Sequence, residues 1–228
     1  MRILHRPDTL LGMSGVRIRG MKGPTMKKAL VAVVMILVEL SAFAYAEQPL
    51  DTLQKLIDQG ITILNDPIYK DTAQKDIQRQ ELSEILNQLV DFKEFCRRAL
   101  ASNLLKFTPQ QLDEFTALFA KFVTVYYLAM LQDNYTNEKV IPIRQNLIST
   151  SKAVVQVTVF WNNIEIPVEI KMVRRDDSWK AYDIIVLGIS VVRFYGAQFQ
   201  EILRKETPDQ IIARLKLKIR KIENNLKG

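Results

Sequence analysis

Few side chains in this chain have the types and spacing that catalysis needs. The 228 residues include one histidine, His5, and one cysteine, Cys96. Neighbouring carboxylates at Asp113 and Glu114, and at Asp176 and Asp177, have the chemistry for acid–base work. The first pair is expected on the solvent side of a helix and the second pair in a turn. Solvated surface charge is therefore the better interpretation of both pairs.

The position of the histidine excludes whole classes of chemistry. His5 lies in a segment that we expect to be removed, which leaves no imidazole to activate a serine or cysteine nucleophile. Zinc sites built on His and Cys are excluded for the same reason. The sequence also has no G-x-x-x-x-G-K-[ST] or G-x-G-x-x-G loop to hold a phosphate group. We therefore expect no enzyme activity, no metal and no cofactor.

Residues 1–46 have the features of a leader that contains a signal peptide. Two lysines follow Met26, an apolar run covers 29–38, and an A-x-A cleavage signal ends at Ala46. We expect translation to start at Met26, cleavage after Ala46, and export of a mature domain, 47–228, to the periplasm. Glu39 interrupts the apolar run, so an uncleaved signal anchor is the alternative.

Most of the basic charge belongs to this leader. The whole chain has a formal net charge of +7, from 32 Lys and Arg against 25 Asp and Glu. Residues 1–46 contain seven of the basic and two of the acidic residues, so the mature part, with 25 and 23, has a net charge of only +2. We therefore expect no nucleic-acid partner. The single Cys96 cannot form an intrachain disulfide, and we expect it to be a small buried apolar residue.

The mature sequence changes from helical to strand periodicity and then returns to helical periodicity. Helical spacing of apolar residues is evident over 49–89, with a break near 65–67, and a short helix is expected from Asp91. Thr108 and Thr207 each precede a proline and lie three residues before a glutamine, which predicts two helix starts. The last helix has cations around an apolar stripe and could touch a membrane surface, although core packing is the commoner role.

After Asn134 the apolar period becomes two, which predicts an antiparallel sheet. Four strands are expected, with one apolar and one polar face. We predict an α+β fold in which a helical layer packs on a twisted, mainly antiparallel sheet of about four strands. The predicted strands cover 139–149, 153–161, 164–173 and 179–187.

Several segments together resemble the MlaC family, also called the toluene-tolerance family. Their order and spacing agree over about 48–222. Phe194 and Gly196 depart from the pattern, where Asn and Arg are expected, and Cys96 stands where Ser is usual. The matching segments are DFKEFCRRAL at 91–100, FTPQQL at 107–112, SWKAYD at 178–183, GIS at 188–190, the Y-x-x-Q-F pattern at 195–199, and TPD at 207–209.

The resemblance implies a periplasmic phospholipid carrier that helps to maintain the lipid asymmetry of the outer membrane. Such a carrier moves lipid between an outer-membrane lipoprotein complex and an inner-membrane ABC transporter with its substrate-binding ring subunit, and we expect it to be a monomer. Two alternatives remain open. The cargo could be a hopanoid or another polycyclic lipid, or the chain could be a periplasmic interaction module with a solid core and no ligand.

The resemblance also implies an internal apolar cavity between the helices and the sheet. Two sixteen-carbon tails cost about 25 kcal/mol to expose to water, at about 0.8 kcal/mol per methylene, so a carrier must enclose them. We also predict an internal ion pair between Arg98 and Asp183, because a buried charge needs a partner. The candidate lipid-binding residues, for which ordinary core packing is the alternative, are Phe115, Phe119, Phe122, Tyr126, Val157, Ile166, Val168, Ile170, Val192, Tyr195 and Phe199.

Overall fold

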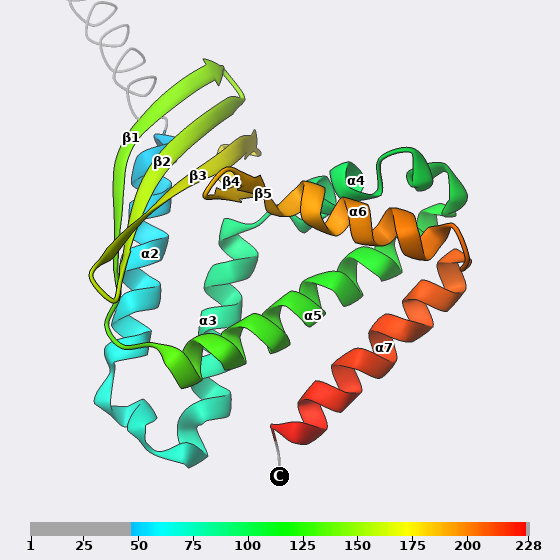
Figure 1. Cartoon of the computed structure of the whole chain (residues 1–228). Coiled ribbons are helices and arrows are strands. Elements are labelled where there is room, and N and C mark those ends of the chain that lie inside the picture. The colour runs from blue at the N-terminus through cyan, green and yellow to red at the C-terminus, as the bar shows by residue number, and fades with distance from the viewer. Residues whose placement is uncertain (1–46, 227–228) are drawn as a thin grey trace, which may run out of the picture. The chain divides into compact units, whose positions relative to one another are not determined.

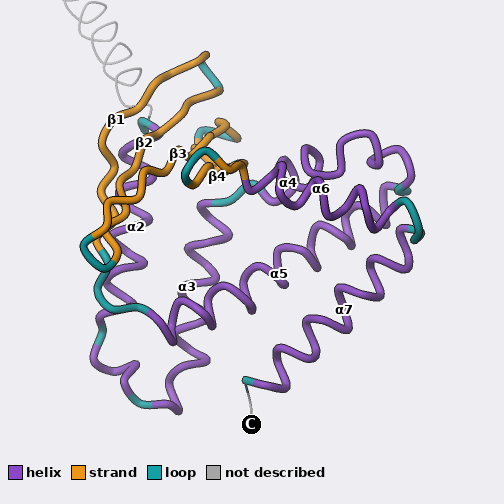
Figure 2. Tube along the Cα trace, in the orientation of Figure 1, coloured by secondary structure: helices purple, strands orange, loops and turns teal. Residues whose placement is uncertain are grey.

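The structure is a computed structural model that describes residues 47–226 (Figure 1). The predicted start site, signal peptide and cleavage site lie outside the described residues. The described part alternates between helices and one sheet, and Figure 2 shows the sheet on one side of a group of helices. The helical elements are α2 (Pro49–Asn65), η1 (Pro67–Lys70), η2 (Thr72–Gln74), α3 (Lys75–Leu89), α4 (Phe92–Leu100), η3 (Ala101–Lys106), α5 (Pro109–Asn134), α6 (Val191–Leu203) and α7 (Pro208–Asn225).

Side-chain caps fix where several of these helices begin, among them α4, α5 and α7. The Thr108 hydroxyl accepts a hydrogen bond from the Gln111 backbone N–H, and the Gln111 side chain accepts one from the Thr108 backbone. Thr207 and Gln210 repeat this capping box at α7. Asp91 caps α4 by accepting from the backbone N–H of Glu94 at 2.8 Å. Both helix starts predicted from the Thr-Pro-x-Gln pattern are confirmed.

The sheet is antiparallel and has the order β1-β2-β3-β4-β5. Two-residue turns with positive φ at both positions join β2 to β3, at Asn162 and Asn163, and β3 to β4, at Asp176 and Asp177. These backbone angles suit the right-handed twist of hairpins. The predicted α+β fold is confirmed. The strands are β1 (Lys139–Ser149), β2 (Lys152–Trp161), β3 (Ile164–Arg175), β4 (Ser178–Val186) and β5 (Ile189–Ser190).

The fifth strand was not predicted. β5 has two residues and pairs with β4 after a turn that places Gly188 at φ 80°. A glycine adopts this left-handed conformation without the steric cost that a side chain adds. Two residues are too few to show a period, so the sequence pattern cannot reveal such a strand.

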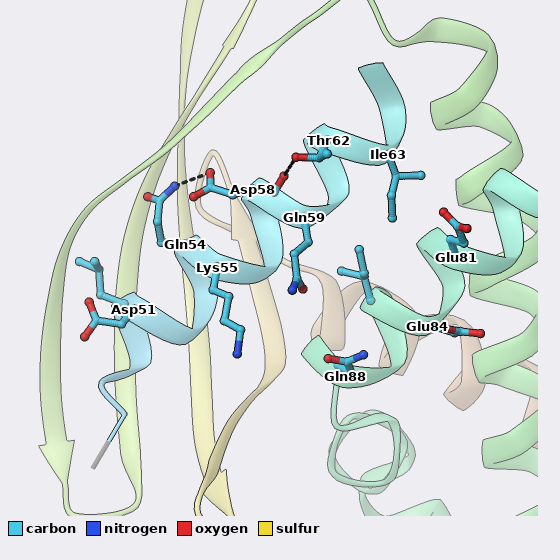
Figure 3. Close-up of a pocket in the computed structure, with 12 residues that line it drawn as sticks. Asp51, Gln54, Lys55, Asp58, Gln59, Thr62, Ile63, Glu81, Glu84 and Gln88 are labelled. Atoms are coloured by element: carbon cyan, nitrogen blue, oxygen red, sulfur yellow. Dashed lines mark hydrogen bonds between the residues drawn. The ribbon is translucent and has the colours of Figure 1, made fainter. Parts of the chain in front are cut away.

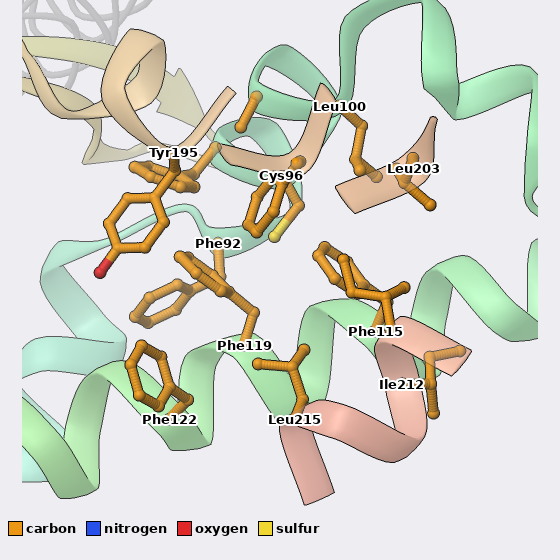
Figure 4. Close-up of a cluster of buried hydrophobic side chains, with 14 of the residues drawn as sticks. Phe92, Cys96, Leu100, Phe115, Phe119, Phe122, Tyr195, Leu203, Ile212 and Leu215 are labelled. Carbon is orange, nitrogen blue, oxygen red and sulfur yellow. The ribbon is translucent and has the colours of Figure 1, made fainter. Parts of the chain in front are cut away.

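Two separate hydrophobic cores stabilise the domain. The helical core lies between α4, α5, α6 and α7, and stacked aromatic rings fill it (Figure 4). The sheet core lies between the inner face of the sheet and α2, where Leu53 is fully buried. The apolar face of the sheet therefore packs mainly on α2, whereas α5 packs on α7, α3 and α4.

Helices α4 and α6 approach closely at Gly196. A Cβ atom at this position would lie 3.0 Å from the backbone oxygen of Ala99. The small residue at 196, one of the departures from the family pattern, therefore allows the backbones of these two helices to come together.

Helix α5 is long and apolar enough to cross a membrane by length and composition. Its Phe115, Phe119 and Phe122 are buried against the other helices of the helical core. The first half of α5 therefore belongs to the helical core.

Candidate functional site

The apolar stripe of α5 is buried at one end and exposed at the other. Phe115, Phe119 and Phe122 are 0%, 1% and 5% exposed, whereas Tyr126 and Met130, further along the same stripe, are 41% and 51% exposed. These residues follow one another at intervals of three or four and share one helix face. The core therefore covers only the first half of the stripe.

The inner face of the sheet changes in the same way along β3. Met172, Ile170 and Val168 are at most 8% exposed, Ile166 is half-buried, and Ile164 is 58% exposed. Alternate residues of a strand share a face, so these five side chains form one row. The predicted apolar face of this strand is confirmed, but the row of apolar side chains continues past the buried residues into the exposed end of the strand.

Strand β2 repeats the pattern beside β3. Val155 and Val157 are 0% and 3% exposed, and Trp161 on the same face is 49% exposed. Trp161 pairs with Ile164 across the hairpin, so the uncovered ends of the two rows are neighbours.

The chain brings the uncovered ends of α5 and of the sheet toward each other. Helix α5 ends at Asn134, and the chain enters the sheet only five residues later at Lys139, which pairs with Phe160 beside Trp161. Figure 1 shows this end of α5 on the same side of the domain as the β2–β3 turn.

A third segment borders the same region. Strand β5 leads into α6, where Phe194 is 54% exposed and Tyr195 is buried. The Tyr195 and Tyr127 hydroxyls lie 2.7 Å apart and share a hydrogen bond between α6 and α5. We call the combined set of partly exposed apolar residues the open apolar surface: Tyr126, Tyr127, Met130 and Leu131 on α5, Trp161, Ile164 and Ile166 on β2 and β3, and Val186, Ile189 and Phe194 on β4, β5 and α6.

Polar groups at the edge of this surface are few and specific. Burial raises the pKa of Tyr195, and the hydrogen bond with Tyr127 adds to the effect, so the phenol stays protonated. Lys218 of α7 places its Nζ 4.7 Å from the centre of the Phe122 ring, which stacks on Tyr126. A cation and two hydroxyls therefore lie beside an otherwise apolar face.

Most of the predicted lipid-binding residues belong to one or other of the two hydrophobic cores. Phe115, Phe119, Phe122, Val192, Tyr195 and Phe199 belong to the helical core. Val157, Val168 and Ile170 belong to the sheet core, and Ile166 packs against it. They fall into two clusters because α2 packs on the inner face of the sheet, whereas α5 packs on other helices. Of the predicted residues, Tyr126 and Ile166 lie on the open apolar surface.

The aromatic rings of the helical core are closely packed. The ring centres of Phe119 and Tyr195 are 5.0 Å apart, and those of Phe115 and Phe199 are 5.2 Å apart. Such edge-to-face contacts are typical of a filled core.

Two clefts lie elsewhere, and neither contains a predicted lipid-binding residue. One, of about 990 Å³, runs between α2 and α3 and is lined by Asp51, Asp58, Glu84 and other polar side chains (Figure 3). The other, of about 840 Å³, lies between α3, α5 and α7, and most of the residues that line it are also of polar types. Carboxylates and amides suit water better than acyl chains. Neither cleft is the internal apolar cavity that was predicted.

The predicted ion pair between Arg98 and Asp183 is wrong. The Arg98 guanidinium pairs with Glu94 at 2.7 Å and lies over the Tyr182 ring. Asp183 accepts hydrogen bonds from the Ser190 hydroxyl and from the backbone N–H of Val192, so it stabilises the start of α6. Glu94 is four residues before Arg98 on α4, and this i,i+4 spacing explains the preference.

Glu94 is buried and is the centre of a charge network with three partly exposed arginines. Its carboxylate accepts from Arg97 at 2.8 and 2.9 Å, from Arg98 at 2.8 Å, and from Arg175 of β3 at 3.2 Å. The hydrogen bonds from Arg97 lower the pKa of Glu94 to about 2, with a further contribution from Arg98 and against the effect of burial. Arg175 also bonds to Asp91, so the network holds α4 against the sheet.

Residues with catalytic or metal-binding chemistry are not gathered at this site. Within 47–226, no group of three or more His, Cys, Asp or Glu side chains could hold a metal ion. Cys96 is fully buried, as predicted, and burial raises the pKa of its thiol to about 12. A thiol this buried and this weakly acidic is a packing residue.

Comparisons with known proteins agree with this architecture. The family model described as "MlaC protein" matches residues 54–217. A search of curated proteins finds no match. Among solved structures, a phospholipid-binding protein from Ralstonia solanacearum, in complex with a phospholipid, has the same fold with a TM-score of 0.66 and 20% identity, covering 78% of this chain and 99% of that chain. Because the family model spans more than half of the chain, this chain belongs to the MlaC family.

Proposed function

We propose that the chain binds a phospholipid and holds its acyl chains against the open apolar surface. The observation that carries this proposal is the pair of apolar faces, on α5 and on the inner side of the sheet, that both lose their cover toward the same end of the domain. A protein that only needed a solid core would gain stability by covering Met130 and Ile164. The similar fold of the phospholipid complex from Ralstonia supports the same ligand class.

Exposed apolar surface of this kind suits reversible lipid binding. Tails that cover it gain about 25 cal/mol for each Å² removed from water, while a site that is open on one side leaves part of the tail accessible. The lipid can then leave when another apolar surface takes over the contact. A carrier needs such near balance, because a large net gain in free energy would trap the cargo.

The polar groups beside the open apolar surface suit the polar end of a phospholipid. Lys218 is positively charged and lies over Phe122 at the boundary of the surface. The Tyr127 and Tyr195 hydroxyls can donate to phosphate or ester oxygens once their shared hydrogen bond is broken. We assign these groups to the headgroup and glycerol region.

We further propose that the mature protein works in the periplasm, without enzyme activity or a cofactor, as a shuttle. The expected partners are an outer-membrane lipoprotein complex and an inner-membrane ABC transporter complex. The family membership and the leader pattern support this setting. Retention of both complexes by the exported, tagged chain tests the partners, and recovery in a membrane fraction that a high-salt wash does not release would contradict a free periplasmic carrier.

Mass spectrometry of lipid extracted from the natively purified protein tests the ligand. We expect phospholipid in stoichiometric amount. Recovery of a hopanoid in its place would support the alternative cargo, and protein free of any lipid would support the interaction module.

A further inference from the structure

Helix α7 has an outward face that the domain itself does not use. Its inner face buries Ile211, Ile212, Leu215 and Ile219 in the helical core. Leu217 points away from these residues and is 54% exposed. An apolar side chain left in water at this position gains nothing for folding.

Cations surround Leu217 on this outward face. Arg214 precedes it by three residues, and Arg220 and Lys221 follow it by three and four, so all three are its neighbours on the helix surface. All three are exposed. A leucine among cations is the pattern of helices that lie on anionic membrane surfaces.

Acidic residues do not neutralise the centre of this face. Between residues 213 and 224 the single acid is Glu223, whose carboxylate pairs with Lys121 of α5 at 2.8 Å. Arg214 pairs with Glu206 outside this stretch. Within the described chain, no ion pair involves Arg220 or Lys221.

The charge of the whole domain is distributed unevenly around α7. Residues 191–228 contain nine Lys and Arg and four Asp and Glu, a net charge of +5. Residues 47–90, which form α2 and α3, contain four basic and eight acidic residues, a net charge of −4. Figure 1 shows α7 and α2 on opposite sides of the domain. An anionic surface would therefore attract the α7 side and repel the α2 side.

We propose that the outward face of α7 is a docking surface for an anionic lipid bilayer. Arg214, Arg220 and Lys221 lie at the depth of the headgroup phosphates, and Leu217 inserts between the headgroups. The opposite charge of the α2–α3 side keeps that side toward water and fixes the orientation of the domain. This surface is separate from the open apolar surface, and the proposal holds whether or not a lipid is bound there.

Co-sedimentation with lipid vesicles tests the proposal on the mature chain. We use vesicles of phosphatidylcholine alone and vesicles in which about a third of the lipid is phosphatidylglycerol. Binding is expected only to the anionic vesicles, and it should fall steeply near 1 M salt, where the Debye length is about 3 Å.

Matched variants locate the contact. R220Q/K221Q should weaken binding to anionic vesicles about 25-fold, at about fivefold for each cation, without changing thermal stability. The control K139Q/K152Q removes the same charge from exposed lysines of the sheet and should leave binding within about twofold of the parent. L217S should weaken binding about fivefold or more, whereas L105S, at a residue 91% exposed in η3, should not.

Two outcomes would overturn the proposal. Equal losses for the α7 and sheet charge variants would show that net charge alone controls the binding. No binding to anionic vesicles would remove the bilayer as the partner and leave an acidic protein surface as the class that fits α7.

Discussion

Polar substitution on the open apolar surface should reduce lipid affinity far more than it reduces stability. Ile164 and Met130 are 58% and 51% exposed, so about half of each side chain remains in water when no lipid is bound. Full burial of such a side chain is worth about 1.5–3 kcal/mol, of which the ligand supplies roughly half. The double variant I164T/M130Q, which replaces both apolar side chains by polar ones, should therefore lose roughly 2 kcal/mol of lipid binding, or about 30-fold in affinity.

The assay is transfer of a fluorescent phospholipid from vesicles to the protein, together with thermal unfolding of the lipid-free form. The control I77Q/L105Q changes two apolar residues that are 49% and 91% exposed on α3 and η3, away from the proposed site. We expect the control to bind lipid normally. Equal affinity of both double variants, or a loss of binding that only follows a loss of folded protein, would refute the reasoning.

Three further predictions concern stability. The folded-state pKa of Glu94 is about 2 against 4.5 for the free side chain, so its contribution to stability, up to about 3 kcal/mol, is present above pH 4.5 and is lost as the pH falls toward 2. In urea unfolding, the free energy of unfolding of E94Q should therefore decline less over this pH range than that of the parent. An equal decline would contradict the charge network. G196A should destabilise by about 1–3 kcal/mol through its contact with α4, while G60A, where a Cβ has open space, should be neutral or stabilising in the same melts. Y127F should lower the free energy of unfolding by about 1–3 kcal/mol, because it leaves the buried Tyr195 hydroxyl unpaired. The double variant Y127F/Y195F should recover part of this loss. Additive effects of the two substitutions in the double-mutant cycle would argue against the hydrogen bond.

The sequence pattern predicted those elements whose signal is local. Strand β3 shows strict alternation from Ile164 to Met172, and the Thr108 and Thr207 capping boxes give helix starts with a mechanism. The two-residue β5 has no period to detect. The pairing of Arg98 was predicted wrongly, although the i,i+4 spacing from Glu94 was visible in the sequence.

The sequence predicts which apolar faces contribute to the site, but it does not predict which parts of them stay uncovered. Periodicity identifies apolar faces on α5 and on the sheet, but it does not say which helix covers the sheet, and Leu53 of α2 gives the same signal as any core leucine. Met130 and Phe122 lie on one stripe and differ only in what packs over them. That difference depends on the placement of α6 and α7, which is a tertiary property. Sequence reasoning therefore included Phe122 and missed Met130, Trp161 and Ile164.

The most direct test of the account is photocrosslinking with a phospholipid that has a diazirine in one acyl chain, followed by peptide mapping of the adducts. We predict adducts on the second half of α5, around Tyr126–Leu131, and on the β2–β3 hairpin near Trp161 and Ile164. Adducts confined to the polar cleft between α2 and α3, or spread evenly over the surface, would contradict the open apolar surface as the place where the acyl chains bind.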